Sequence, residues 1–366
     1  MILAIDPLCF FLYIGPMKIA VLASGGVDSS LALRLLKEED KHELHAFYLK
    51  IWLEDELASI GECPWEEDLD YVRSTCAMLD VPLTVVPLQG AYREKVVTHA
   101  VAELKAGRTP SPDILCNERV KFGAFYDQID DTFDKVASGH YAQIEEKDGA
   151  FLLKRAPDPI KDQTYFLSNL NQAQLKRALF PIGHLQKNEV RQLANDFELP
   201  AAKRKDSQGI CFLGKIKFPD FVRFHLGEQE GDIIEVETQK IWGQHQGVWF
   251  YTIGQRQGIG LHGGPWFVVD KNLETNTLYI SHKSAYMQHA RREFFVQRPH
   301  WIGEPPTSPN LQCKIRHGPE MFDCTLKEMN DGQQHLTLNQ KDAGITPGQS
   351  AIFYEGPYCL GGGVIQ

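Results

Sequence analysis

A glycine-rich turn constrains the fold of this chain more than any other feature. Ser24-Gly25-Gly26-Val27-Asp28-Ser29-Ser30 lies between an apolar stretch at residues 19–22 and a segment at 29–37 with leucines on one helical face. The stretch predicts a buried strand and the segment a helix. Glycines let the backbone turn tightly and bring N–H groups near an anion, and a helix N-terminus adds partial positive charge. We therefore expect a strand–loop–helix unit that binds phosphate groups.

The loop lacks the GxxxxGK[ST] pattern of a Walker loop. Asp28 would repel a phosphate group unless a cation lay between them, so it indicates a pyrophosphate bridged by Mg²⁺. The alternative is a glycine-rich turn whose Ser and Asp residues only cap the following helix.

The first half of the chain alternates between predicted strands and predicted helices. Further strands are expected at 45–51, 83–86 and 135–137, and further helices at 66–79, 92–105, 117–129, 172–179, 188–197 and 218–225. This alternation indicates βαβ units and an α/β fold with a doubly wound parallel sheet. Ligands of such sheets bind at the carboxyl ends of the strands.

After Gly231 the pattern changes to short strands separated by Gly, Pro and Asn turns, which predicts barrels or sandwiches. Strands are expected at 248–253, 266–269, 277–280, 312–315, 324–326, 335–338 and 350–354. We therefore divide the chain into an N-terminal extension (1–16), a nucleotide-binding catalytic domain (17–212), a small central mostly-β domain (213–278) and a C-terminal β-barrel (279–366).

Residues 1–16 are apolar but shorter than the ~20 residues of a membrane span. They also lack the basic start and the cleavage site of a signal peptide. We expect either that Met17 is the true start or that residues 1–16 are a dispensable extension, and we expect a cytoplasmic protein without membrane attachment. In that reducing compartment a disulfide would be transient and catalytic.

Charge is unevenly distributed along the chain. The formal net charge of −10 argues weakly against nucleic-acid binding. However, residues 171–225 hold ten Lys or Arg against five Asp or Glu, whereas residues 54–70 hold eight acidic side chains and no basic one. The basic stretch is compatible with a solvated surface or with an RNA-binding face.

Two of the eight cysteines, Cys116 and Cys211, are expected in polar loops beside a helix start or basic residues. Cys116 follows Asp113 before a predicted helix, and Cys211 follows three cations at 203–205. A helix N-terminus or nearby cations lower the pKa of a thiol, and two reactive thiols can close a disulfide that ejects a sulfur product. No CxxC pair occurs, which argues against a zinc knuckle. We expect buried apolar roles for Cys63, Cys76, Cys313, Cys324 and Cys359.

The motifs together resemble one family. SGGVDSS resembles the PP-loop of the ATP pyrophosphatases. Further motifs are GRTPSPDILCN (107–117), SGHYA (138–142), KDQTYFL (161–167), KDSQGICF (205–212), YTIGQRQGIG (251–260), TPGQSAIFY (346–354) and CLGGG (359–363). With these, the chain is similar to the tRNA-specific 2-thiouridylases over residues 18–366.

The resemblance implies a reaction and its partners. ATP with Mg²⁺ adenylates the 2-oxygen of the wobble uridine of a tRNA, a persulfide supplies sulfur to that carbon, and AMP and pyrophosphate are released. Cys211 is implied to carry the persulfide, Cys116 to attack it and end in a disulfide with Cys211, and Asp113 to act as acid or base. The implied partners are the anticodon loop of tRNA and a persulfide donor, either a cysteine desulfurase or a sulfur-relay protein.

The resemblance also implies the binding residues, with Asp28 as the metal ligand. Leu49 is expected beside the adenine, where the family often has Met, and Gly139 near the nucleotide. The other expected ATP contacts are Leu22, Ala23, Ser24, Gly25, Gly26, Val27, Asp28 and Ser29. The expected tRNA contacts are Ser111, Pro112, Asp113, Lys161, Asp162, Gln163, Arg316 and His317. The target base must be splayed out of the loop before chemistry can reach it.

Two other functions stay open at this point. Another PP-loop adenylating enzyme, such as an amide-forming synthetase, would need no paired cysteines, and a non-catalytic tRNA-binding or sulfur-carrier protein would need no ATP loop. His140 is compatible with a packed or a catalytic role. The aromatic residues near Trp249 and Trp266 are expected in a barrel core.

Overall fold

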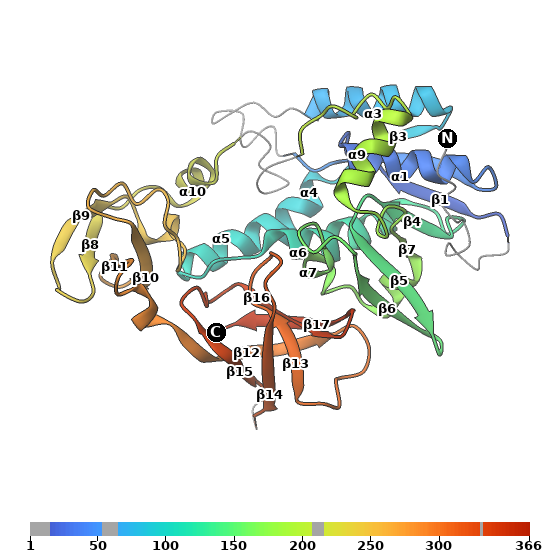
Figure 1. Ribbon diagram of the computed structural model, residues 1–366. Helices are drawn as coiled ribbons and strands as arrows, with labels where there is room; N and C mark the ends of the chain where they lie inside the picture. The colour runs from blue at the N-terminus through green and yellow to red at the C-terminus, as the bar shows by residue number, and fades with distance from the viewer. Residues whose placement is uncertain (1–14, 53–64, 207–215, 330–331) are drawn as a thin grey trace.

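The computed structural model describes residues 15–52, 65–206, 216–329 and 332–366. Cys211 and nearly all of the expected N-terminal extension lie outside these ranges. Figure 1 shows an α/β part that carries the N-terminus, a small β part at one side, and a barrel that carries the C-terminus. No helix in the described ranges is both long and apolar enough to cross a bilayer.

A five-stranded parallel sheet in the order β3-β2-β1-β4-β7 forms the core of the α/β part. Its strands are β1 (Lys18–Leu22), β2 (Glu43–Lys50), β3 (Leu83–Pro87), β4 (Lys135–Ser138) and β7 (Ala178–Leu179). The first strand pairs with β2 on one side and β4 on the other, so the strand order reverses at β1. The predicted doubly wound sheet is confirmed, and the glycine turn follows the strand at which such sheets bind ligands.

Both faces of the sheet are covered by helices. Ile19 and Val21 of β1 pack with α1 (Val27–Glu38) and α3 (Trp65–Leu79), whereas Ala20 and Leu22 face the opposite layer. This alternation is the period-two pattern of a strand buried on both sides. The opposite layer contains α4 (Gln89–Tyr92), the π-helical turn η2 (Arg93–Val97) and α5 (Thr98–Lys105).

The helix expected at 117–129 begins earlier and is irregular. It starts as α6 (Pro112–Cys116), with proline in the first turn where no N–H is needed, and continues as η3 (Asn117–Ala124) and η4 (Tyr126–Gln128). The expectation that Cys116 lies in a polar loop was therefore wrong. Cys116 is helical and only 2% exposed, because the helix packs against the sheet.

A hairpin of β5 (Ala142–Lys147) and β6 (Ala150–Arg155) was not predicted. It leads through α7 (Thr164–Leu167) and α8 (Gln172–Arg177) to α9 (Lys187–Asp196). Strand β6 pairs with the last strand of the chain, with Leu153 opposite Cys359. The hairpin therefore extends a sheet of the barrel and joins the α/β part to it, as Figure 1 shows.

The central part begins with α10 (Phe218–Leu226) and contains a four-stranded sheet. The strands are β8 (Gly231–Glu235), β9 (Ile241–His245), β10 (Trp266–Asn272) and β11 (Thr277–His282), and the turn η6 (Tyr286–His289) follows. The strand expected at 248–253 was wrong, because the 3₁₀ turn η5 (Val248–Phe250) follows Gly247, whose φ is 138°. Trp266 is buried in this core, as predicted.

The predicted C-terminal barrel is confirmed. Its strands are β12 (Arg291–Trp301), β13 (Asn310–Lys314), β14 (Phe322–Glu328), β15 (Gln334–Asp342), β16 (Ser350–Glu355) and β17 (Tyr358–Ile365). Pairing of β12 with β17 closes the barrel. The domain boundaries at 212/213 and 278/279 stay predictions.

A buried ion pair joins the barrel to the α/β part. Lys314 at the end of β13 and Asp162 before α7 have fully buried side chains, and Lys314 Nζ lies 3.1 Å from Asp162 Oδ2. The Nε of Arg155 donates to the same oxygen at 3.2 Å, and the hydroxyl of Thr164 donates to Asp162 Oδ1 at 2.9 Å. Buried charges are tolerated only when they are paired and hydrogen-bonded, so these contacts fix the relative position of the two parts.

Replacing Lys314 with Met should lower the free energy of unfolding of the barrel by about 3 kcal/mol, because Asp162 would keep a buried charge with one cation fewer. Urea denaturation followed by tryptophan fluorescence measures this loss. Lys327→Met, on the exposed side of β14, is the control and should change stability by less than about 0.5 kcal/mol. A Lys314→Met protein as stable as the control would refute the role of the pair.

Candidate functional site

The glycine turn after β1 forms an open anion cradle. Gly26 is the N-cap of α1, and no side chain caps this helix end, so its first N–H groups point outward without a side-chain acceptor. Ser24 is exposed, its hydroxyl lies 3.2 Å from that of Ser29, and the Ser29 hydroxyl donates to the Gly26 carbonyl at 3.1 Å. These groups suit the phosphates of a nucleotide.

The expected glycines are required by close backbone packing. A Cβ on Gly139, just after β4, would lie 2.7 Å from both the carbonyl carbon of Asp28 and the nitrogen of Ser29. A Cβ on Gly25, whose φ is +76°, would lie 2.4 Å from the carbonyl oxygen of Asp68. The structure therefore brings Gly139 against the first turn of α1; its contact with a nucleotide stays a prediction. Leu49 lies on the neighbouring strand β2 and is partly buried.

An ion-pair network surrounds the acidic residue of the turn. Lys187, at the start of α9, donates to both carboxylate oxygens of Asp28 at 2.7 and 2.9 Å and lies 2.9 Å from Asp206. The Tyr141 hydroxyl donates to Asp28 at 2.7 Å. Burial and the Asp28 charge raise the pKa of Tyr141, so this hydroxyl stays protonated. The negative charge of Asp28 is therefore paired with the ammonium of Lys187. A phosphate beside Asp28 would also lie next to this ammonium.

This finding changes the argument for Mg²⁺ at Asp28. The sequence suggested a metal because an unpaired carboxylate would repel phosphate, but Lys187 already compensates that charge. The described residues contain no cluster of three or more His, Cys, Asp or Glu side chains placed to hold a metal. The donor set fits a Mg²⁺ ion held mainly by ATP phosphates, with Asp28 as its one carboxylate.

Asp206 ties the nucleotide loop to the segment that precedes Cys211. Burial alone would raise the pKa of its carboxyl, but hydrogen bonds from Lys161 and Lys187 outweigh burial and lower the pKa well below its usual range. Lys161 lies 2.7 Å from Asp206, and Arg191 also donates to it. Arg204 donates to the Gly25 carbonyl at 2.9 Å and pairs with Asp68. Several cations of the basic stretch thus pair within the molecule.

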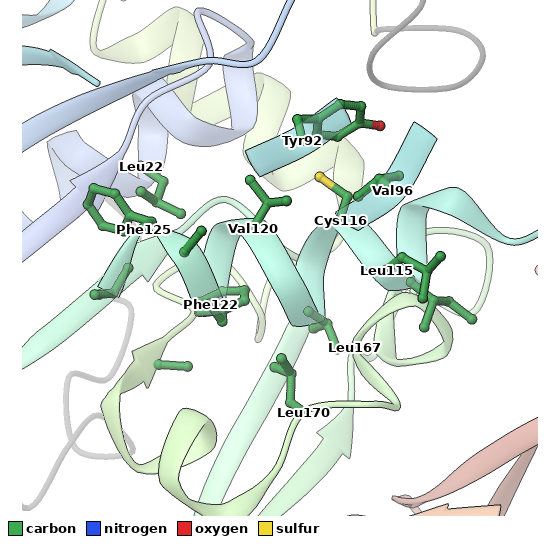
Figure 2. Packing of buried hydrophobic residues seen from close by; sticks show 14 of the residues in the cluster. Leu22, Tyr92, Val96, Leu115, Cys116, Val120, Phe122, Phe125, Leu167 and Leu170 are labelled. Atoms are coloured by element: carbon green, nitrogen blue, oxygen red, sulfur yellow. The ribbon is translucent and has the colours of Figure 1, made fainter. Parts of the chain in front are cut away.

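Helix α6 places two predicted catalytic residues at different depths. Asp113 is partly exposed in its first turn, whereas Cys116 at its end belongs to the apolar cluster that contains Leu22, the last residue of β1. Figure 2 shows Cys116 beside Tyr92 and Val96, in the same layer as Leu22. Cys211 lies outside the described residues, so its pairing with Cys116 stays a prediction.

A cavity of about 890 Å³ lies where the α/β part, the central part and the barrel meet. Five of the predicted tRNA contacts line it: Ser111, Pro112, Asp113, Arg316 and His317. Segments more than two hundred residues apart in the chain therefore form one pocket; contact of these residues with tRNA stays a prediction. Its volume is at the upper end for ligand sites, so it has room for more than a single base.

The two predicted barrel contacts have different environments in this cavity. The guanidinium of Arg316 donates to both oxygens of Asp342, at 2.9 and 2.6 Å, and to Glu320 at 3.0 Å, so its charge is compensated. The exposed ring of His317 stacks on Phe166, with ring centroids 4.5 Å apart. Burial lowers the pKa of His317, so the ring is neutral at pH 7.

The predicted Lys161–Asp162–Gln163 contact segment is largely occupied within the protein. Asp162 is buried against Lys314, so its side chain is not available to tRNA and its role in the structure is the ion pair. The amide oxygen of Gln163 accepts from the backbone nitrogen of Tyr141 at 2.9 Å. Lys161 bonds Asp206 and keeps about a third of its side chain exposed, so it is the member of this segment best placed for RNA.

The open alternatives for His140 and the remaining thiols are resolved where the structure describes them. His140 accepts or donates a 2.7 Å hydrogen bond with Ser138 and packs between Phe122 and Phe180, and its pKa is lowered by burial. It is a packed side chain. The predicted buried role of Cys76, Cys313, Cys324 and Cys359 is confirmed, and burial raises the pKa of Cys76 to about 11. Cys63 lies outside the described residues.

Sequence reasoning missed Lys187, Tyr141 and Asp206 as parts of the nucleotide site. Tyr141 and Asp206 stand inside the SGHYA and KDSQGICF motifs, so their positions were marked although no role was assigned to them. Lys187 had no local signal except its place in the basic stretch, because its partner Asp28 is 159 residues away.

Comparison with protein-family models defines the class of protein to which the chain belongs. The sequence matches three family models in order: "tRNA methyl transferase HUP domain" at residues 17–215, "tRNA methyl transferase PRC-barrel domain" at 219–282 and "Aminomethyltransferase beta-barrel domain" at 291–365. The protein is thus an α/β HUP-domain protein with two β domains after it.

Curated relatives define the family more closely. The chain is 44% identical to the tRNA-specific 2-thiouridylase MnmA 1 of Bacteroides thetaiotaomicron and 42% identical to MnmA of Parabacteroides distasonis. It is 43% identical to MnmA of Porphyromonas gingivalis, and each match covers 95% of this chain and 99% of the relative. This chain belongs to the family of tRNA-specific 2-thiouridylases.

Replacing Lys187 with Met should weaken ATP binding by about tenfold or more, because a charge-assisted hydrogen bond to a phosphate would be lost and Asp28 would face the phosphate unpaired. Isothermal titration calorimetry with ATP measures this effect. Lys203→Met, at an exposed position of the same basic stretch, is the matched control and should bind ATP as the unmodified protein does. Equal affinities of the two variants would exclude Lys187 from the nucleotide site.

Gly139→Ala should also reduce ATP affinity, by at least about tenfold, because the new methyl group would press on the backbone of the first turn of α1. The control is Gly90→Ala in α4, where a Cβ would meet nothing within 4 Å. Both proteins should keep the circular dichroism of the unmodified chain. Normal ATP binding by Gly139→Ala would show that the loop tolerates displacement.

Proposed function

We propose that this protein is an ATP-dependent tRNA 2-thiouridylase acting on the wobble uridine. One observation carries the proposal: the short helix α6 has Asp113 on the wall of the large cavity and Cys116 at its other end. The residue that would meet the target base and the thiol that would attack the persulfide sulfur are therefore held by one helix.

In the first step the uridine 2-oxygen attacks the α-phosphorus of ATP, and pyrophosphate leaves. Asp113 would accept the N3 proton of the base, which the attack makes more acidic. The N–H groups at the start of α1 and the Lys187 ammonium would stabilise the charge that develops on the departing pyrophosphate. Mg²⁺, when bound beside Asp28, would supply further positive charge to the phosphates.

In the second step the terminal sulfur of a Cys211 persulfide attacks carbon 2, and AMP leaves with the original oxygen. The Cys116 thiolate then attacks the Cys211 sulfur of the new S–S link. The outer sulfur stays on carbon 2 with the bonding electrons, Asp113 would return the proton to N3 so that the product is the thiocarbonyl, and Cys116 and Cys211 close a disulfide. An external thiol must reduce this disulfide, and a persulfide donor, either a cysteine desulfurase or a sulfur-relay protein, must recharge Cys211 before the next turnover.

Rival functions account for fewer of the described features. An amide-forming synthetase would activate a carboxylate and has no use for the Asp113–Cys116 helix at the pocket. A tRNA-binding protein without catalysis has no use for a phosphate cradle with Lys187 and Asp28.

Nucleoside analysis of tRNA tests the proposal directly. Incubation of unmodified tRNA with the protein, ATP, Mg²⁺ and a persulfide source should yield 2-thiouridine, detected by mass spectrometry, and omission of ATP should abolish it. Cys116→Ser and Cys211→Ser should each lower the yield by at least about a hundredfold, since both thiols take part in the transfer. The control Cys76→Ala, in the apolar cluster on the opposite face of the sheet from Cys116, should retain thiolation. Full activity of both serine variants would refute the mechanism.

A further inference from the structure

Two stacked ring pairs contribute to the wall of the large cavity. His317 of the barrel lies on Phe166 of α7, with centroids 4.5 Å apart and planes at 29°. Tyr286 of η6 lies on Phe267 of β10, with centroids 4.2 Å apart and planes at 18°. His317, Phe166 and Tyr286 all line the cavity, and each is exposed or only partly buried. Each pair is rigid because one ring supports the other.

Two glycines of the cavity wall lie close to Tyr286 and Arg316. A Cβ on Gly254 would lie 3.4 Å from the Tyr286 hydroxyl and 3.3 Å from Gly344, and a Cβ on Gly344 would lie 3.1 Å from the Arg316 guanidinium. Arg316 directly precedes His317 in the chain. Because these two glycines carry no side chains, they do not narrow the cavity beside Tyr286 and Arg316.

Charge does not explain this part of the cavity. Asp342 and Glu320 compensate Arg316, and His317 is neutral at pH 7. A phosphate would gain little here. Flat, partly apolar groups with polar edges gain more, because stacking on aromatic rings suits the face of every nucleobase. Single-stranded RNA loops are recognised in this way, by bases splayed onto aromatic rings.

We propose that His317 supported by Phe166, and Tyr286 supported by Phe267, are two stacking platforms for the bases that flank the target uridine in the anticodon loop. This inference rests on the proposed function and adds a recognition mode to it. Asp113 on the same cavity wall meets the target base, and the platforms hold its neighbours apart, which stabilises the splayed loop. Phe166 and Phe267 are positioning residues, because they act through the rings that they support.

The test measures both affinity and stacking. Two anticodon stem-loop RNAs carry 2-aminopurine, one on the 5′ side and the other on the 3′ side of the wobble uridine, because the fluorescence of this base is quenched when it stacks. With the unmodified protein, the emission of both RNAs should fall on binding. Tyr286→Leu and Phe166→Leu should each weaken RNA binding by about tenfold, and each should restore the emission of one of the two probes. The matched controls Tyr286→Phe and Phe166→Tyr keep the rings and should retain both affinity and quenching. ATP binding should be unchanged in all four variants.

The RNA provides a second test that needs no protein variant. An abasic site in place of the flanking base should weaken binding to the unmodified protein by the same factor, and should have no further effect on the leucine variant that lacks the matching platform. If the leucine variants bind the intact stem-loop as tightly as their controls, the platforms are refuted while the proposed function stands. If the unmodified protein does not bind the stem-loop at all, the proposed function fails, and the platforms fail with it.

Discussion

The buried ion pair between Asp162 and Lys314 is the contact on which the arrangement of both sites depends. A carboxylate and an ammonium that are both fully buried persist only with good geometry and further hydrogen bonds, which Arg155 and Thr164 supply. Asp162 lies in the α/β part and Lys314 in the barrel, 152 residues later. The pair therefore fixes a barrel strand against the segment that runs between the two sites.

That segment, residues 158–166, contacts the nucleotide site at one end and the cavity at the other. Asp158 accepts from the backbone nitrogen of Lys187 at 3.1 Å, and Lys161 bonds Asp206. Phe166, eight residues after Asp158, supports the ring of His317. The side chain of Asn117, next to Cys116, donates to the Phe166 carbonyl at 3.0 Å. The nucleotide site, helix α6 and the large cavity are thus all contacted by this one short segment. A small displacement of the segment would therefore disturb all three.

Local sequence was sufficient for the parts of the fold that are set by local physics. The strand–turn–helix around Gly25 and Gly26, the parallel sheet and the barrel class followed from periodicity and from glycine positions. The β5–β6 hairpin was not predicted, although its Asp148-Gly149 pair is a local turn signal: both residues have positive φ, as the Asp-Gly turn of a hairpin requires. The burial of Cys116 and Asp162 could not be predicted from the sequence, because it arises from partners far away in the chain. The same holds for Lys187 beside Asp28 and for the stack of His317 on Phe166.

The fate of the uridine oxygen tests most directly whether nucleotide and base meet in one site. A tRNA labelled with ¹⁸O at the 2-position of the wobble uridine would be thiolated in a single turnover, and the released AMP analysed by mass spectrometry. The account predicts one ¹⁸O atom in the phosphate group of AMP for each thiouridine formed, since the activated oxygen leaves with the adenylate. Recovery of the label in water or pyrophosphate, with unlabelled AMP, would contradict it.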